Sequence, residues 1–339
     1  MTESLEIRTT DYHTAGEPFR IVTSGTPDIP GATVPERREY ARGSDDVDRV
    51  RRLLVQEPRG HADMYGCFVV PPNDGGADFG TLFWHKDGYS TACGHGTIAL
   101  GVWAVDTGRV AAADDGDTDV VIDVPSGRVT ARVTRRAGRT ERVTFRNVPS
   151  YVVARDVPVP TSRGPVLVDV SYGGAIYASV SAPSVGLTVT PECYADLIAV
   201  GREVKWALND AEVARHAEDP RLSGIYGTIL YEDLPATADG PHQRNVTVFA
   251  DGEADRSPCG SGTCARAALL SADGRLGDGQ VLTHDSIVGS RFLARIAERS
   301  TGPMGEAVVV EVEGDAFRTG EHLFVLDPRD SIGTGFVLR

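Results

Sequence analysis

Short stretches in which apolar and polar residues alternate recur in both halves of the chain. In the first half they cover residues 118–124, 127–134 and 140–148, and glycine and proline residues separate them. The second half repeats the pattern at residues 307–312 and 322–326. A period of two residues is typical of antiparallel strands with one buried face, so the pattern predicts a sheet in each half.

Three other segments are compatible with helices. Residues 45–56 place their valine and leucine residues on one helical face, and Ser44 is a suitable N-cap. Residues 97–104 and 263–272 are short and largely apolar, and each begins directly after a glycine-rich turn. We expect each of these two to be a buried helix.

An internal repeat connects the two halves. Residues 90–101 read STACGHGTIALG and residues 256–267 read RSPCGSGTCARA, so both contain Cys-Gly-x-Gly-Thr. The segments that follow are also alike, PSGRVTARV from Pro125 and VGSRFLARI from Val288. A looser match precedes them, TTDYHTAGEPFRIV in the first half and VDVSYGGAIYASV from Val168 in the second. Matches in the same order indicate a duplicated domain.

The repeat and the strand pattern together predict an α+β protein of two domains, each a mostly antiparallel sheet around one central helix. We expect the first domain to cover residues 1–160 and the second residues 161–326. The boundary falls at residues 158–164, which have the proline and glycine density of a linker. Residues 236–242 are expected to form an exposed loop.

Composition limits the class of protein and its partners. The chain has 339 residues, of which 41% are hydrophobic, enough for two buried cores. The formal net charge of −14 argues against a nucleic acid or an anionic membrane as partner, because both require a basic surface. The start of the chain lacks the pattern of a secretory signal, and no apolar run approaches the roughly 20 residues of a membrane helix.

The five cysteines form no CxxC pair, which is unlike a disulfide framework or a zinc ribbon, so we expect a reducing cytoplasm. Cys67, Cys193 and Cys264 have no counterpart in the other half and are expected to be buried packing residues. Cys93 and Cys259 precede the two short helices. A helix N-terminus binds anions and lowers the pKa of a nearby thiol, which predicts a carboxylate site with two reactive cysteines.

This arrangement predicts a reaction class. If a pseudo-twofold axis relates the domains, both helix N-termini can hold one carboxylate and present its α-carbon between two sulfurs. One thiolate then removes the α-proton while the opposite thiol protonates the other face, which inverts the carbon. The scheme requires neither a metal nor another cofactor. Asp255 could meet a cationic amine or be an ordinary turn carboxylate, and His95 could contact the substrate or satisfy backbone groups. His13 and Glu17 are assigned no catalytic role.

Three other interpretations of the cysteine motifs are weaker. Gly94 and Gly260 each begin a G-x-G-x-x-A pattern, but no buried strand precedes it as nucleotide binding requires, and Pro258 is hard to place in a central strand. A cysteine hydrolase needs a single cysteine with a histidine distant in sequence, whereas here the whole motif is duplicated. A purely structural role for both cysteines does not explain why cysteine itself is repeated.

Four segments resemble the proline racemase family in order and spacing, and the resemblance extends over nearly the whole chain. They read HTAGEPFRIV at residues 13–22, MYGCFVVPP at 64–72, GYSTACGHGTIALG at 88–101 and DRSPCGSGTCAR at 255–266. The resemblance implies the diaminopimelate-epimerase-like fold of two pseudo-symmetric domains with the site in the cleft between them. It also implies that the C-terminal segment, taken as residues 327–339, returns to the first domain.

The resemblance also implies roles for individual residues. Cys93 and Cys259 fall on the two catalytic positions, and Asp255 falls on the residue that meets the ring nitrogen of the substrate. The turns that hold the substrate carboxylate correspond to Gly94, His95, Gly260 and Ser261.

The family includes proline racemase, 4-hydroxyproline 2-epimerase and trans-3-hydroxy-L-proline dehydratase. Dehydratases usually carry threonine where this chain has Cys259, because elimination of water needs only one base for the α-proton. The resemblance therefore favours inversion of proline or 4-hydroxyproline, most of all a 4-hydroxyproline 2-epimerase.

Other features leave alternatives. The segments MYG and GYSTACGHGTIALG also look like the dehydratase branch, while Ala92, Ser261 and Cys264 depart from common family residues. Dehydration of trans-3-hydroxy-L-proline is one alternative, and a non-catalytic amino-acid-binding protein is another. The expected partner is a small-molecule substrate, and a homodimer is compatible with the sequence.

Overall fold

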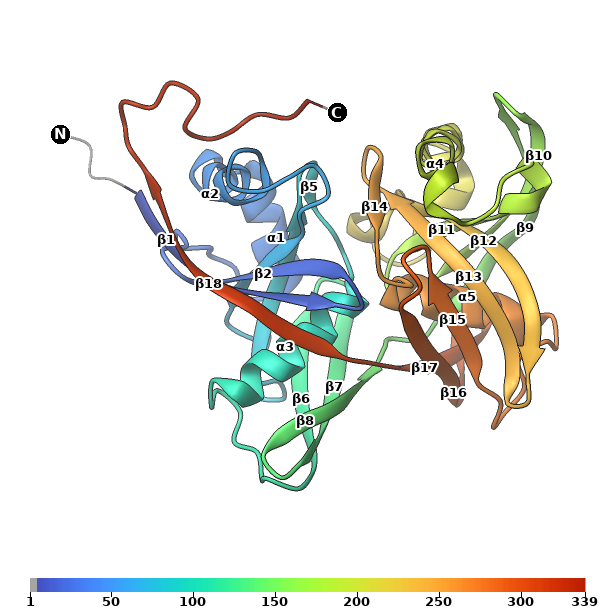
Figure 1. Cartoon of the computed structure of the whole chain (residues 1–339), viewed down its shortest axis with the longest axis horizontal. Helices are drawn as coiled ribbons and strands as arrows, with labels where there is room; N and C mark the ends of the chain where they lie inside the picture. The colour runs from blue at the N-terminus through green and yellow to red at the C-terminus, as the bar shows by residue number, and fades with distance from the viewer. Residues whose placement is uncertain (1–4, 339) are drawn as a thin grey trace.

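Two buried helices organise the structure, a computed structural model that describes residues 5–338. Helix α3 (Gly94–Asp106) lies in one lobe and α5 (Gly260–Ala272) in the other (Figure 1). Almost every residue of both helices is buried, because strands surround each helix on several sides. The two expected buried helices are therefore confirmed, and in each the glycine-rich turn forms the first helical turn.

The strands of the first lobe form one continuous mixed sheet. In spatial order they are β18 (Ala316–Leu326), β1 (Leu5–Thr14), β2 (Glu17–Ser24), β3 (Gly66–Val70), β4 (Phe79–His85), β6 (Gly116–Val124), β7 (Gly127–Arg136) and β8 (Arg139–Arg146). Neighbouring strands are antiparallel except β2–β3 and β4–β6, which are parallel. The short strand β5 (Gly88–Tyr89) pairs with β4.

The second lobe repeats this arrangement strand for strand. Its order is β9 (Tyr151–Thr161), β10 (Gly164–Tyr172), β11 (Ile176–Ser181), β12 (Ile225–Thr237), β13 (Gly240–Phe249), β15 (Leu282–Ser286), β16 (Arg291–Gly302) and β17 (Gly305–Gly314). The parallel pairs, β11–β12 and β13–β15, occupy the same places in the order. The short β14 (Glu253–Asp255) pairs with β13, as β5 pairs with β4. This correspondence confirms the duplication, and the antiparallel pair β8–β17 joins the two sheets.

The last strand of each repeat belongs to the sheet of the other repeat. β9 follows β8 in the chain but pairs with β10 of the second lobe, and β18 follows β17 but pairs with β1 of the first lobe. Figure 1 shows β18 running from one lobe to the other. The return to the first lobe thus begins at Ala316, earlier than expected, and Phe336 then bridges to Glu57.

Two expected irregular segments are regular in the structure. Residues 158–164 are not a linker, because they end β9 and turn into β10 with Thr161 opposite Gly164. Residues 236–242 are not a simple loop either, since they contain the hairpin turn between β12 and β13. The chain instead passes between the lobes at residues 147–150 and at Asp315.

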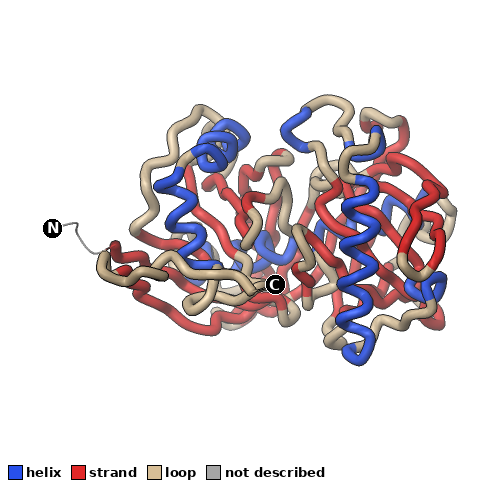
Figure 2. The backbone as a smooth tube through the Cα atoms, turned by 90° about the horizontal axis from the view of Figure 1, so that it is seen from above, coloured by secondary structure: helices blue, strands red, loops and turns tan. Residues whose placement is uncertain are grey.

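The remaining helices lie outside the sheets. α1 (Val34–Gly43) and α2 (Asp45–Val55) follow β2, and α4 (Tyr194–Leu208) follows β11 and is the long helix of the second lobe in Figure 2. α2 is the expected helix, and the Ser44 side chain accepts a hydrogen bond from the Val47 N–H as predicted. Four short 3₁₀ helices flank α4, at Ala182–Val185, Pro191–Cys193, Glu212–Ala214 and Pro220–Leu222.

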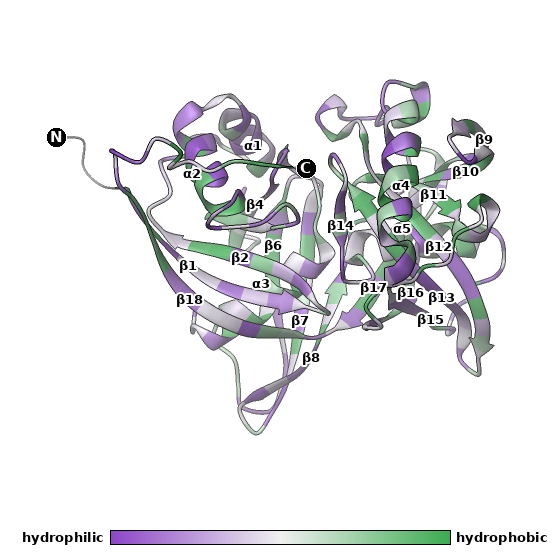
Figure 3. Cartoon of the chain, turned by 45° about the horizontal axis from the view of Figure 1, so that its top comes forward, coloured by the Kyte–Doolittle hydropathy of each residue, from purple (hydrophilic) through white to green (hydrophobic). Residues whose placement is uncertain are grey.

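The predicted strand β7 buries every second residue from Val129 to Val133, and β16 shows a similar alternation of buried and exposed residues. β18 does not alternate, and in Figure 3 the part of β18 that pairs with the start of β1 is hydrophobic. Among residues 5–338, no helix combines the length and the apolar character needed to cross a membrane.

Candidate active site

The N-termini of α3 and α5 meet head to head where the lobes touch. A Cβ atom at Gly94 would lie 2.5 Å from the Cα of Gly260, and one at Gly260 would lie 2.6 Å from the Cα of Gly94. Cβ atoms do not approach other atoms so closely, so only glycine at both positions allows this contact. The repeated glycine therefore brings two sets of free helix N–H groups together.

Cys93 and Cys259 are the N-cap residues of these two helices. The Gly96 N–H donates a hydrogen bond of 3.2 Å to the Cys93 Sγ. Cys259 has a φ of +64°, a region that non-glycine residues rarely adopt. Both cysteines are buried, with 5% of the surface of Cys93 and 4% of the surface of Cys259 exposed. The duplicated motif thus places one cysteine of each lobe at a common buried site.

The thiol pKa values differ from the prediction. Burial raises the pKa of Cys93 well above its usual range, although the Gly96 N–H acts in the opposite direction. Burial also raises the pKa of Cys259, and the nearby Asp255 carboxylate adds to the rise. The expected lowering of the thiol pKa toward neutrality is therefore wrong, because desolvation of the thiolate outweighs the helix N–H groups.

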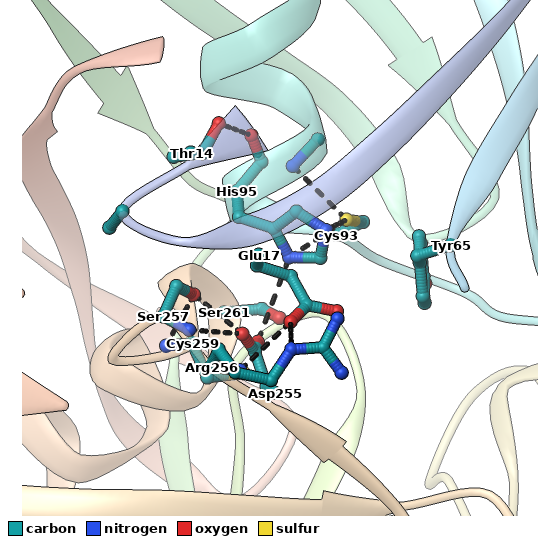
Figure 4. A network of polar contacts seen from close by, with 12 residues as sticks. Thr14, Glu17, Tyr65, Cys93, His95, Asp255, Arg256, Ser257, Cys259 and Ser261 are labelled. Carbon is teal, nitrogen blue, oxygen red and sulfur yellow. Dashed lines mark hydrogen bonds and ion pairs between the residues drawn. The ribbon is translucent and has the colours of Figure 1, made fainter. Parts of the chain in front are cut away.

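A polar contact joins the lobes beside the cysteines (Figure 4). His95 follows Cys93 by two residues, and its ring nitrogens lie 3.5 and 3.6 Å from the Cys93 Sγ. The His95 Nδ1 is 3.6 Å from an oxygen of Asp255, and the Ser257 N–H and hydroxyl donate to the other oxygen at 2.8 and 2.7 Å. Burial favours a higher pKa for Asp255, but His95 and Ser257 outweigh it and the pKa is lowered. A buried, ionised carboxylate of this kind suits a cationic amine.

Aromatic side chains that the sequence analysis did not select line the same space. The Tyr177 hydroxyl lies 2.7 Å from the Ser261 Oγ and 3.8 Å from the Cys259 Sγ. Phe19 packs edge-on against His95 with ring centroids 5.8 Å apart. Comparison of the two repeats could have selected both residues, because Phe19 and Tyr177 occupy matching places after the first hairpin turn of each lobe.

Tyr65 was a further missed residue. Its ring centroid lies 5.0 Å from that of His95, and its hydroxyl is 3.2 Å from the hydroxyl of Tyr226 in the other lobe. Tyr65 stands in the MYG segment that resembles the family, to which no role was given. Its hydroxyl therefore makes a polar contact between the lobes beside the site.

A buried network holds the segment before Cys259. The carbonyl of Pro258 accepts hydrogen bonds from the Asn245 side chain at 3.0 Å and from the Thr263 hydroxyl at 3.2 Å. Thr263 also bonds to His284 at 2.8 Å, and burial lowers the pKa of His284 to about 3, so its imidazole is neutral. These contacts fix the backbone that delivers Cys259 to the N-terminus of α5.

A cleft of about 520 Å³ opens between the lobes next to the buried cysteines. Ser90 and Thr91 line it from the first lobe, and Ala175 and Tyr226 line it from the second. Cys93 adds to the rise in the pKa of Tyr226 that burial causes, so the cleft wall is electrostatically close to the thiols. Thr91 in the cleft wall stands only two residues before Cys93.

One group of side chains near the cleft has donor atoms suited to a metal ion. His85, Asp87 and Glu253 offer ligand atoms within 4.8 Å of one another. The Lys86 ammonium lies 2.5 Å from an oxygen of Asp87 and 3.9 Å from one of Glu253. Because this cation already compensates the two carboxylates, the cluster is better suited to joining the lobes than to holding a metal.

The structure brings all of the sequence-selected residues together at the lobe boundary, namely Cys93, Gly94, His95, Asp255, Cys259, Gly260 and Ser261. The other three cysteines lie elsewhere. Cys67 and Cys264 are buried as expected, but Cys193 is partly exposed, so that expectation is wrong. Cys193 ends a 3₁₀ turn just before α4, where its Sγ contacts the Thr188 hydroxyl at the surface.

Comparison with known proteins places the chain among characterised relatives. The family model described as proline racemase matches residues 9–337. A trans-3-hydroxy-L-proline dehydratase of Burkholderia cenocepacia is 44% identical, and a 3-hydroxyproline 2-epimerase of Burkholderia multivorans is 43% identical; each match covers 100% of both chains. A solved hydroxyproline epimerase from Agrobacterium vitis, with bound trans-4-hydroxy-L-proline, superposes with a TM-score of 0.91 at 30% identity, covering 98% of this chain and 96% of that one. These similarities agree with the diaminopimelate-epimerase-like fold.

Proposed function

Because the chain belongs to the proline racemase family, we propose that it is a cofactor-independent hydroxyproline 2-epimerase in which Cys93 and Cys259 are the two acid/base groups. One observation carries this proposal. The two cysteines cap helices that meet N-terminus to N-terminus, one from each lobe. A carboxylate bound by these helix ends presents its α-carbon to a sulfur on either side.

The proposed reaction exchanges one proton for another. The substrate carboxylate accepts hydrogen bonds from the N–H groups at the starts of α3 and α5, and Asp255 binds the ring ammonium. One cysteine, as thiolate, takes the α-proton, and the electron pair left on the α-carbon is stabilised by the hydrogen-bonded carboxylate. The opposite thiol gives its proton to the other face, so the carbon is inverted and the thiol and thiolate have changed places.

The ring position of the hydroxyl is proposed from the relatives. The sequence alone favoured 4-hydroxyproline, and the structure with bound trans-4-hydroxy-L-proline belongs to a relative at 30% identity. The relatives at 43 and 44% identity carry names that refer to 3-hydroxyproline. We therefore place trans-3-hydroxy-L-proline ahead of the 4-hydroxy isomer as substrate. The names of the dehydratase relatives favour a second candidate, dehydration of trans-3-hydroxy-L-proline.

Proton NMR in D₂O distinguishes these reactions. The purified protein is incubated separately with trans-3-hydroxy-L-proline, trans-4-hydroxy-L-proline and L-proline. Loss of the α-proton signal together with the signals of the C2 epimer supports the two-base proposal, and the fastest substrate gives the ring position. Loss of water from the 3-hydroxy compound without appearance of an epimer would establish a dehydratase instead.

The cysteines are tested by single substitutions. We expect Cys93→Ala and Cys259→Ala each to lower the epimerisation rate by roughly 10²–10⁴-fold, the usual contribution of one general acid or base. Substrate binding, followed by calorimetry, should change little. The matched control is Cys67→Ala, since Cys67 is also buried but lies in β3 outside the site. Rapid inversion by either site variant would contradict the two-base scheme.

A further inference from the structure

A buried ion pair joins the lobes on one side of the site. Glu17 is fully buried at the start of β2, and its Oε2 accepts a hydrogen bond of 2.8 Å from the backbone N–H of Arg256 in the other lobe. The Arg256 Nε lies 2.9 Å from the same oxygen. Arg256 directly follows Asp255, so the ion pair fixes the backbone next to the carboxylate that is proposed to bind the substrate amine.

Asp63 of the first lobe makes further contacts with the same segment of the second lobe. It accepts a hydrogen bond of 3.2 Å from the Ala254 N–H, and its carboxylate lies 3.6 Å from the Arg256 guanidinium. Three successive residues of the second lobe, 254–256, are therefore held against the first lobe. The Asp255 side chain points from this held segment toward His95 (Figure 4).

The pseudo-symmetry of the molecule allows the ion pair of Glu17 and Arg256 to be compared with the equivalent positions of the other repeat. Ser90 stands three residues before Cys93, as Arg256 stands three before Cys259, and Ala175 matches Glu17 in the first hairpin of its repeat. At that second position the small Ser90 and Ala175 line the cleft of about 520 Å³. The site is thus closed by an ion pair on one side and open on the symmetry-related side.

We propose that Glu17 is a positioning residue of the active site: through its ion pair with Arg256 it holds Asp255 in place for the substrate amine. The pair also makes this side the fixed side of the site, so that substrate enters from the Ser90 and Ala175 side. This proposal rests on the proposed function, because the amine contact belongs to it.

The physical reason lies in the charge of Arg256. Burial lowers the pKa of Arg256, but Glu17 and Asp63, and to a smaller extent Asp255, outweigh burial and raise it. Glu17 binds the guanidinium through its Oε2, although burial raises the pKa of Glu17 and the charge of Arg256 offsets this only in part. Without this contact Arg256 can pair with Asp255, which then has less negative charge to offer a substrate ammonium.

The test compares two five-membered-ring carboxylates. The hydroxyproline that NMR identifies as substrate carries a ring ammonium, whereas tetrahydrofuran-2-carboxylate has an uncharged ring oxygen in its place and no ring hydroxyl, so each ligand is compared between the variant and the unchanged protein. With Glu17→Gln we expect Kd and KM for the amino acid to rise roughly tenfold, a coupling usual for charges in contact. The Kd of tetrahydrofuran-2-carboxylate should stay within about twofold, and kcat should fall less than KM rises.

Direct contact between Glu17 and the amine is the competing explanation, because the Glu17 Oε1 has no hydrogen-bond partner among the described residues. A double-mutant cycle separates the two. If Glu17 acts through Asp255, Glu17→Gln adds little in an Asp255→Asn background, whereas additive losses would overturn the proposal. Arg256→Lys, which leaves Glu17 in place, should also weaken binding of the amino acid selectively.

A structural control completes the experiment. Asp11 and Arg20 form a buried ion pair of 2.8 Å in the first lobe, away from the cysteines, so Asp11→Asn should lower the melting temperature without selectivity between the ligands. Equal weakening of both ligands by Glu17→Gln would mean a merely structural role. If Glu17→Gln does not fold, Arg256→Lys decides by the same comparison. If tetrahydrofuran-2-carboxylate binds but none of the three ring amino acids does, the proposed function fails and this proposal falls with it.

Discussion

The space around residue 94 determines how closely the two helix N-termini, and the cysteines that cap them, can approach each other. An alanine there would place its Cβ 2.5 Å from the Gly260 backbone, which has no flexible side chain to move aside. We expect Gly94→Ala to separate the helix ends and to lower kcat/KM by on the order of 10²-fold, as a displacement of about 1 Å does at other sites.

Gly43→Ala is the control for this variant. Gly43 ends α1, and a Cβ at that position would meet no atom within 4 Å. Steady-state kinetics of the two variants, with circular dichroism to verify folding, checks the prediction. Equal activity of both variants would show that the glycine contact is not needed for closure.

The raised thiol pKa values predict how activity depends on pH. The proposed reaction needs one thiolate, and burial holds the pKa of both Cys93 and Cys259 above the ordinary value for cysteine. Since a thiol loses its proton as pH rises, the thiolate fraction should increase about tenfold per pH unit below the lower of the two pKa values. We expect kcat/KM to climb steadily from pH 6.5 to 9. A plateau below pH 8 would mean that the free enzyme already holds a thiolate at neutral pH.

The meeting of the two cysteines at one site could be predicted from sequence, but their electrostatics could not. Repetition of Cys-Gly-x-Gly-Thr sufficed to select Cys93, Cys259 and the glycines beside them. The thiol pKa depends on how completely the opposite lobe covers each sulfur, and no local pattern encodes that. Glu17 was passed over for a similar reason, because its partner Arg256 lies in the other repeat.

Single elements were predicted where their signal is local. α2 shows an apolar face and a serine cap, and both are present in the structure. α4 also carries Leu197, Val200 and Val204 at helical spacing, so this helix could have been predicted and was overlooked. The wrong interpretation of residues 158–164 has a physical cause. Prolines are tolerated in β9 because it is an edge strand, and its ladder partner is β10.

The cap of α2 allows a quantitative check at this scale. Replacing Ser44 by alanine removes the hydrogen bond from the Val47 N–H, and the typical cost is about 1 kcal/mol in the free energy of unfolding. Activity should not change, because α2 lies outside the site. Ser24→Ala, at the exposed end of β2, should leave the stability unaltered in the same urea titration. A similar loss in both variants would refute the cap as its cause.

At the scale of the whole molecule, each lobe depends on the far end of the chain. β18 pairs with β1 along its whole length and packs beside α3. We expect a chain that ends at Gly314 to expose the edge of β1 and one side of α3, and therefore to aggregate or melt without cooperativity. Thermal melting and size-exclusion chromatography would detect this.

A chain that ends at Asp327 is the appropriate comparison. It retains β18 and removes only the last residues, whose contacts include the bridge between Phe336 and Glu57. It should fold cooperatively with both cysteines in place. A well-folded, active chain ending at Gly314 would show that β18 is dispensable.

The exchange of β9 and β18 also bears on how such a chain arose. Each repeat ends in the strand that completes the sheet of the other, so two separate copies of an ancestral half would have closed each other's sheets in the same way. Each polypeptide of such a pair would have contributed one thiol to the single shared centre. Fusion of the copies then required no more than the two-residue turn between Thr161 and Gly164. Gene duplication would thus have turned a symmetric assembly of two chains into one chain, and freed its two halves to diverge.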